Sequence, residues 1–343
     1  MKKILRKYTM PLSIVGCLLL IYFSTISGIT SIPFNDANRI LLHEILRIPV
    51  NMDGIAPGNI AIIWNVRLPR VILGFLTGGA LAVCGASYQG IFKNPMADPF
   101  ILGVSSGAAL GAAIGIVCHL SGSLLGLNGT ALLAFLGAFL TIILVYNISR
   151  VGRKVPVASL LLSGIAVGQS LSAFMSLIMI FNVQNMNQIM FWTMGSLNGK
   201  GWNQVFIVLP YIIIGMIILF TSLRELDIML LGEDAATQLG VNTEFLKKKV
   251  LIASSIITAA VVSVTGIIGF VGLVVPHVVR MLTGPKHRVL VPFSLVFGGT
   301  FLIICDTLSR SISSQEIPVG IITAAFGGPF FIYLLRKSKK GGA

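Results

Sequence analysis

The chain has 343 residues, of which 55% are hydrophobic and 10% are charged, and its formal net charge at pH 7 is +14. About a quarter of the residues of a soluble domain are charged, so this composition excludes an ordinary soluble protein and indicates an integral membrane protein. The positive charge requires no nucleic-acid partner, because lysine and arginine collect on the cytoplasmic side of membrane proteins.

Long uncharged stretches predict about ten membrane-spanning helices, since a helix needs roughly 20 apolar residues to cross the hydrocarbon core of a bilayer. In chain order we expect these spans near residues 9–30, 70–92, 99–118, 125–148, 156–180, 203–223, 250–268, 270–283, 289–306 and 316–335. Together they predict an all-α integral membrane protein with a single transmembrane domain over residues 1–343.

The distribution of basic residues predicts the orientation of the chain. Ten spans place both termini on one side of the membrane, and cytoplasmic flanks hold an excess of lysine and arginine. If the termini are cytoplasmic, most of the 25 basic residues are cytoplasmic too, and those left outside are Arg39, Arg47, Arg67, Arg70, Lys200 and Arg310. We therefore expect both termini and the loop at residues 224–249 in the cytoplasm.

Glycines recur every four residues in the third predicted span, at Gly103, Gly107, Gly111 and Gly115. Small residues at this spacing form a groove along one helix face, against which another backbone can approach closely. The pattern predicts a tightly packed bundle rather than a wide, water-lined channel.

The loop at residues 224–249 is the most polar segment of the chain and reads RELDIMLLGEDAATQLGVNTEFLKKK. Glu233 and Asp234 suit the N-terminus of a short helix, and Gly240 suits its end. A small, alanine-rich helix of this kind can fit into a cleft on a soluble partner protein. The alternative is an ordinary solvated helix without a partner.

The usual signatures of enzymes and cofactor sites are absent from the sequence. It has no phosphate-binding Walker A loop, no HExxH and no GxSxG motif. The cysteines lie in or beside predicted spans without CxxC spacing, which indicates structural thiols; they are Cys17, Cys84, Cys118 and Cys305. We expect no catalytic residues, no cofactor, no metal site and no ATP site in this chain.

One function open to an integral membrane protein is that of an ion-gradient-driven secondary carrier. Such carriers usually need ionisable groups near the middle of the membrane. Asp98, Asp306 and Glu316 fall at predicted span ends, and only His277 falls within a span, close to Arg280. The sequence therefore argues against a proton-coupled or sodium-coupled carrier.

A series of motifs along the chain resembles the FecCD family of ABC importer permeases. The motifs are RLPR at 67–70, GASYQ at 85–89, KNPMADP at 93–99, LGVSSGA at 102–108, LGEDAATQLGV at 231–241, GFVGLVVPH at 269–277, EIPVG at 316–320 and GGP at 327–329. They occur in the family's order and cover residues 60–336, whereas residues 31–60 match no motif.

The resemblance implies the type II ABC importer permease fold, in the bacterial cytoplasmic membrane. The implied partners are a cytoplasmic ABC ATPase dimer, an extracytoplasmic substrate-binding protein or lipoprotein, and a second permease copy or a paralogue. The implied cargo is a ferric siderophore, with haem and cobalamin as alternatives.

Two sets of residues receive roles from the resemblance. Contact with the ATPase is expected of Gly232, Glu233, Asp234, Ala235, Ala236, Leu239 and Gly240. Docking of the binding protein is expected of Arg67, Arg70 and Arg310, because arginine can hold a carboxylate with two hydrogen bonds. The alternative role of these arginines is to anchor span ends at the membrane surface.

Overall fold

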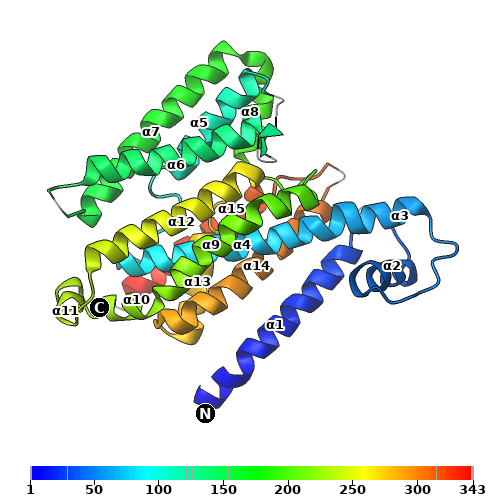
Figure 1. The fold of residues 1–343 in the computed structure, drawn as a ribbon, viewed down its shortest axis with the longest axis horizontal. Coiled ribbons are helices and arrows are strands. Elements are labelled where there is room, and N and C mark those ends of the chain that lie inside the picture. Colours follow the sequence, from blue (N-terminus) through cyan, green and yellow to red (C-terminus); the bar gives the residue numbers. More distant parts are fainter. Residues whose placement is uncertain are drawn as a thin grey trace.

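The structure, a computed structural model, describes residues 2–28, 30–120, 123–124, 127–152, 154–313 and 315–340 (Figure 1). The elements in chain order are α1 (Lys2–Ile26), α2 (Phe34–Leu46), α3 (Pro57–Ala61), the π-helix η1 (Ile62–Arg67), α4 (Leu68–Ile91), α5 (Val104–Val117), β1 (Ser123–Leu124), β2 (Leu127–Asn128), α6 (Gly129–Ser149), α7 (Val157–Phe181), the 3₁₀-helix η2 (Val183–Asn185), α8 (Met186–Thr193), α9 (Trp202–Thr221), α10 (Leu223–Met229), α11 (Glu233–Gln238), α12 (Thr243–Thr265), α13 (Val271–Thr283), α14 (His287–Ser311) and α15 (Val319–Lys340).

Within the described residues, seven helices are long and apolar enough to cross a membrane. Three shorter apolar helices, Val104–Val117, Val271–Thr283 and Val319–Tyr333, fall at the other predicted spans. The prediction of an all-α membrane protein with about ten spans is therefore confirmed. Residues 29 and 125–126, at the ends of two predicted spans, lie outside the described residues, as do residues 1, 121–122, 153, 314 and 341–343 of the predicted domain.

The second span starts well before the predicted residue 70, because α3, η1 and α4 form one apolar stretch from Pro57 to Ile91. Arg67 and Arg70 made this stretch look like a span end. Both are only 5% exposed, and Arg70 pairs with two carboxylates from distant parts of the chain, Asp306 and Glu316. A charge that is paired inside the protein does not end a helix.

The seventh span begins at Thr243 rather than near residue 250. The Asn242 side chain accepts a hydrogen bond from the backbone N–H of Phe245 at 3.0 Å and so caps the helix. Residues 224–249, predicted as a loop, consequently comprise α10, α11 and the first turns of α12.

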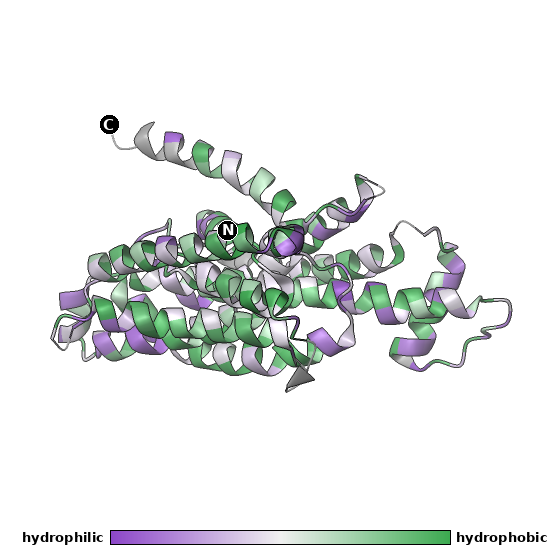
Figure 2. Ribbon diagram, turned by 90° about the horizontal axis from the view of Figure 1, so that it is seen from above, coloured by the Kyte–Doolittle hydropathy of each residue, from purple (hydrophilic) through white to green (hydrophobic). Residues whose placement is uncertain are grey.

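Helix α4 is the centre of the bundle. Most of its residues are buried, and it packs against α14, α13, α12 and α9 (Figure 1). Helix α7, by contrast, is mostly exposed and lies with α5, α6 and α8 to one side of the bundle. The C-terminal part of α15 extends away from the other helices (Figure 2).

The predicted glycine groove on α5 receives α6. A Cβ atom on Gly111 would lie 2.1 Å from the carbonyl oxygen of Leu133, and one on Gly115 would lie 2.7 Å from the Cα of Thr130. Gly103 instead has a φ of +77° and lies against Gly164 of α7. Close packing of α5 against α6 is therefore confirmed, and only Gly103 leaves the groove.

Helix α4 contacts α13 even more closely. A Cβ atom on Gly85 would lie 1.8 Å from the carbonyl oxygen of Gly272. That carbonyl is four residues before Pro276, which has no N–H to donate to it. The Gly272 carbonyl, which lacks its helical hydrogen bond, thus faces Gly85, where there is no room for a side chain. Helix α13 continues through Pro276.

Helix α4 also separates the two regions where the predicted site residues lie. Its 24 residues span about 36 Å at 1.5 Å per residue. Arg70 lies at its start, whereas Gly90, near its end, packs against His287 and Leu226. Helices α10 and α11 accordingly lie at one end of the bundle and α3 at the other (Figure 1).

Candidate functional site

The predicted short helix in the polar loop is present as α11, and two glycines shape its ends. Gly232 precedes it with a φ of +121°, and Gly240 follows it with a φ of +85°. Residues that carry a side chain rarely adopt these backbone conformations. The Gly240 N–H bonds to the carbonyl oxygen of Thr237, and the chain then turns back into α12.

An ion-pair cluster fixes α11 to α12. The Lys247 ammonium is 8% exposed and pairs with the carboxylates of Glu233 and Glu244, the latter at 3.0 Å. The other carboxylate oxygen of Glu244 accepts a hydrogen bond from the backbone N–H of Val155 at 3.0 Å, between α6 and α7. Helix α11 is therefore held to α12 by charged contacts as well as by the chain.

A second contact fixes α10 to α14. The carboxylate of Asp227 accepts a hydrogen bond from the backbone N–H of His287 and lies 3.3 Å from its ring Nδ1. Partial burial raises the pKa of Asp227, but the contacts with His287 outweigh it, so that the pKa is lowered. The His287 ring is fully buried beside Gly90, where a Cβ would lie 2.5 Å from its Nε2.

The outer surface of this region combines an acidic side chain with exposed apolar ones. Leu231 is 69% exposed, Leu239 60% and Phe245 61%, and Asp234 is exposed between them in sequence. Exposed apolar side chains that gather in a polar segment are a feature of surfaces that bind partner proteins. We call Leu231, Asp234, Leu239 and Phe245 the coupling face.

The seven residues predicted to contact an ATPase are all in or beside α11, but they differ in what they do. Asp234 and Leu239 are exposed, whereas Ala236 is buried against the bundle. Glu233 uses its carboxylate inside the chain, on Lys247. Sequence analysis missed Leu231 and Phe245, although large apolar residues in a polar loop were the available signal.

At the other end of the bundle, Arg70 forms the centre of a buried charge cluster. Its guanidinium lies 2.9 Å from the Asp306 carboxylate of α14 and 2.9 Å from Glu316, which precedes α15. Both Arg70 and Asp306 are buried, and the Glu316 side chain is 22% exposed. The cluster joins α4, α14 and the start of α15.

The other two arginines bind the end of α1 to this cluster. Arg310 pairs with Asp306 at 3.2 Å and donates to the carbonyl oxygens of Ser24 and Ser27. Arg67 donates to the carbonyl oxygens of Ile26 and Thr30. Three arginines and two carboxylates thus lie together, with one positive charge in excess. Docking of a binding protein on these arginines stays a prediction, and their guanidinium groups have partners inside the chain.

Among the described residues, no group of three histidine, cysteine, aspartate or glutamate side chains is arranged to hold a metal ion. The described region instead combines a multi-span apolar bundle with a segment of exposed apolar side chains at one end and a charge cluster at the other. These features define a multi-span membrane protein.

The FecCD transport family model matches residues 16–337, and the chain belongs to this family. It is 46% identical to the cobalamin import system permease protein BtuC of Halobacterium salinarum over 275 residues, which are 80% of this chain and 73% of that protein. It is 40% identical to the hemin transport system permease protein HmuU of Yersinia pestis over 285 residues, 81% of this chain and 84% of that one.

A solved structure of a metal-chelate type ABC transporter in an inward-facing conformation is similar over nearly the whole chain. Its TM-score is 0.79 at 31% identity, covering 95% of this chain and 99% of that one. The chain is thus a permease subunit of an ABC importer, with the fold predicted from its motifs. The prediction of a transporter subunit rather than an enzyme is confirmed by these relatives.

Proposed function

We propose that this chain carries a bulky metal chelate across the bacterial cytoplasmic membrane, a ferric siderophore in the first place. Cobalamin is the second candidate, because the relative that is 46% identical is named for cobalamin import, and haem is the third, on the likeness to a hemin permease. A carrier driven by an ion gradient finds no support in these relatives, which are ABC permease subunits.

The orientation that we propose has both termini and the coupling face in the cytoplasm and the arginine cluster outside. The supporting observation is the excess of basic residues on the side of the termini. The position of α10 and α11 at the opposite end of α4 from Arg70 agrees with it.

The observation that carries the proposed mechanism is the coupling face. A cytoplasmic ABC ATPase dimer would cover Leu231, Leu239 and Phe245, which are all more than half exposed. Its closure on ATP would push α11 as a rigid unit. The Glu233–Lys247 and Asp227–His287 contacts would pass that push to α12 and α14.

We propose that Gly232, Ala235 and Gly240 serve this coupling through shape. The glycines allow the turns on either side of α11, and Ala235 keeps the helix slim. Asp234 and Leu239 would contact the ATPase, while Glu233 and Ala236 would hold α11 on the bundle. This division assigns a role to each of the seven predicted residues.

For the outer face we propose docking of an extracytoplasmic binding protein or lipoprotein over Arg67, Arg70 and Arg310. The excess positive charge of the cluster would attract an acidic surface, and its internal bonds would hold the docking surface in one shape. A second copy of this chain, or a paralogue, would complete the transport path along the weakly covered helices α7 and α15.

The cargo and the coupling role can be tested in one uptake experiment. Cells that lack the chromosomal copy receive the wild-type chain or Asp234→Lys, and are offered labelled ferric siderophore, cobalamin and haem separately. We expect uptake of one cargo to require the wild-type chain and to fall at least tenfold in the variant, at equal membrane content. Uptake of all three that does not depend on the chain would overturn the proposed cargo class.

A further inference from the structure

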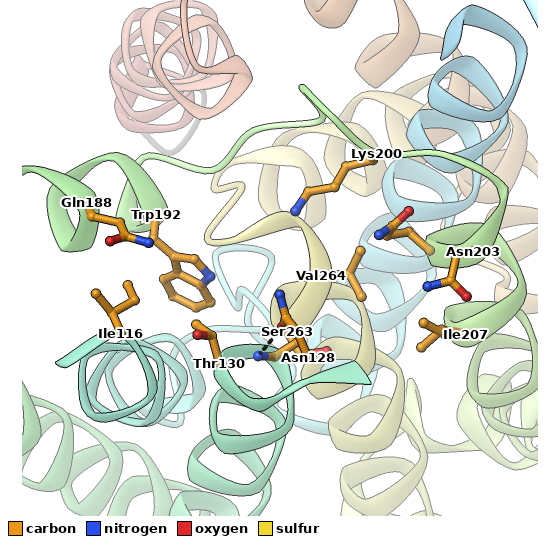
Figure 3. Close-up of a pocket in the computed structure, with 12 residues that line it drawn as sticks. Ile116, Asn128, Thr130, Gln188, Trp192, Lys200, Asn203, Ile207, Ser263 and Val264 are labelled. Atoms are coloured by element: carbon orange, nitrogen blue, oxygen red, sulfur yellow. Dashed lines mark hydrogen bonds between the residues drawn. The ribbon is translucent and has the colours of Figure 1, made fainter. Parts of the chain in front are cut away.

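A pocket lined by both polar and apolar side chains lies at the arginine end of the bundle, away from the coupling face. Its volume is about 460 Å³, and it lies between the ends of α5 and α12, the starts of α6 and α9, and α8 (Figure 3). None of the described residues that line it is acidic.

Lys200 brings a positive charge into this pocket. It belongs to the loop between α8 and α9, and its side chain points into the cavity (Figure 3). Its ammonium group makes no hydrogen bond or ion pair with the part of the chain that the structure describes. Burial lowers the pKa of Lys200. The ammonium has therefore lost part of its hydration without gaining a carboxylate partner.

Two helix N-termini add to the positive potential. Helix α6 begins at Gly129 and helix α9 at Trp202, and residues of both first turns line the pocket. A helix N-terminus carries a partial positive charge and free N–H groups that favour anions. The end of α12 contributes carbonyl groups, but those of Val262 and Thr265 already accept from the N–H groups of Gly266 and Ser196.

The capping side chains of these helices keep hydrogen-bond donors available. The Asn128 side-chain oxygen accepts from the N–H of Ala131 at 2.9 Å, and the Gln204 side-chain oxygen accepts from the N–H of Gly201 at 2.9 Å. Each amide is thereby oriented by its oxygen, which leaves its NH₂ group free to donate. Both amides line the pocket.

We propose that this pocket binds an oxyanion, a carboxylate or a phosphate, borne by a small molecule or by a phospholipid headgroup. Lys200 provides the charge and the Asn128 and Gln204 amides provide neutral donors, while Trp192 and Ile207 form an apolar wall for the rest of the ligand. The site is separate from the coupling face and does not depend on the proposed cargo.

A bound oxyanion would also join α8 to the bundle. Gln188 and Trp192 belong to α8, whereas Asn128 and Gln204 belong to the starts of α6 and α9. A ligand that contacts both sides would stabilise the position of α8, the short helix that follows α7.

Trp192 offers a direct way to detect binding. With Trp64→Phe and Trp202→Phe it becomes the sole tryptophan, since the chain has three. The purified chain in detergent is titrated with inorganic phosphate and with citrate at constant ionic strength, against chloride. We expect a saturable change in fluorescence for an oxyanion, and Lys200→Gln should weaken it about tenfold or more, as expected for a lost charge-assisted hydrogen bond.

Two controls separate charge from folding. Lys200→Arg keeps the positive charge and should retain binding, whereas Lys154→Gln removes an exposed lysine outside the pocket and should change nothing. If the Trp202→Phe background does not fold, the same titrations are read by isothermal calorimetry on the chain with all three tryptophans.

The lipid source is tested by native mass spectrometry after purification from vesicles of phosphatidylcholine with phosphatidylglycerol. Retention of phosphatidylglycerol by wild type and Lys200→Arg but not by Lys200→Gln would identify a headgroup site, and saturable phosphate or citrate binding would identify a free oxyanion. Equal results for wild type and Lys200→Gln in both assays would overturn the proposal. If Lys200→Gln changes only the binding of an added binding protein, and neither oxyanion nor lipid binding, the proposal is overturned in favour of a protein contact.

Discussion

Replacing Asp306 by asparagine should destabilise the fold strongly, because this carboxylate faces two buried guanidinium groups. Arg70 lies 2.9 Å from it and Arg310 3.2 Å, and the Asp306 side chain is 2% exposed. Asparagine keeps the volume, so no cavity forms. Removing one partner of a buried ion pair costs about 3–5 kcal/mol. At about 1.4 kcal/mol per factor of ten, the ratio of folded to unfolded protein should fall by more than about a hundredfold.

The free energy of unfolding can be measured by titration with sodium dodecyl sulfate in mixed micelles. The set comprises wild type, Asp306→Asn, Arg70→Gln, the double variant, and Asp53→Asn as an exposed control. Because Arg70 and Asp306 are in contact, we expect the two single effects to be non-additive by about 0.5–3 kcal/mol. Additive effects, with Asp306→Asn within about 0.5 kcal/mol of wild type, would refute the idea of a buried, mutually dependent cluster.

Further outcomes follow from two other contacts, Gly85 with Gly272 and Asp227 with His287. Gly85→Ala should abolish accumulation of folded protein, because its Cβ would lie 1.8 Å from the Gly272 carbonyl oxygen, whereas Gly58→Ala, with no atom within 4 Å of the added Cβ, should accumulate normally in membranes. Lowering the pH should release α10 from α14, because the pKa of the Asp227 carboxyl is lowered in the folded protein. The carboxylate contributes its full stabilisation at pH values above the ordinary pKa of about 4. This contribution is lost as the pH falls through the lower pKa of the folded state. Asp227→Asn should remove this acid-dependent step, seen as hydrogen exchange of α10, and an unchanged pH profile would contradict it. At the arginine end of the bundle, the rates of hydrogen exchange should be the same in Asp227→Asn and in wild type.

Hydropathy was sufficient to predict the spans, because a bilayer requires long apolar helices whatever their packing. It placed the start of the second span too late along the chain, for an electrostatic reason. Arg67 and Arg70 are charged in the sequence, but Asp306, far away along the chain, neutralises Arg70 within the bundle. A pairing between distant segments cannot be read from the local composition of either one.

The segment at residues 224–249 shows, for single side chains, the same limit to what local composition can predict. The glycines and the acidic start of α11 predict a short helix, because these preferences are local. The sequence does not distinguish Glu233, which pairs with Lys247, from its neighbour Asp234, which is exposed. That difference depends on the direction in which α12 returns past α11. A large apolar residue in a polar loop was a signal for Phe245, but the extent of its exposure depends on how α12 packs.

The central claim is that the chain meets its ATPase through the coupling face, and the most direct test is co-purification of the ATPase with the membrane-embedded chain. We predict that Asp234→Lys and Leu239→Asp retain about 30-fold less ATPase, as expected when a contact worth about 2 kcal/mol is lost from an interface. Asp53→Lys, an exposed acid at the other end of the bundle, should retain it fully. Full retention in all three variants would contradict the account.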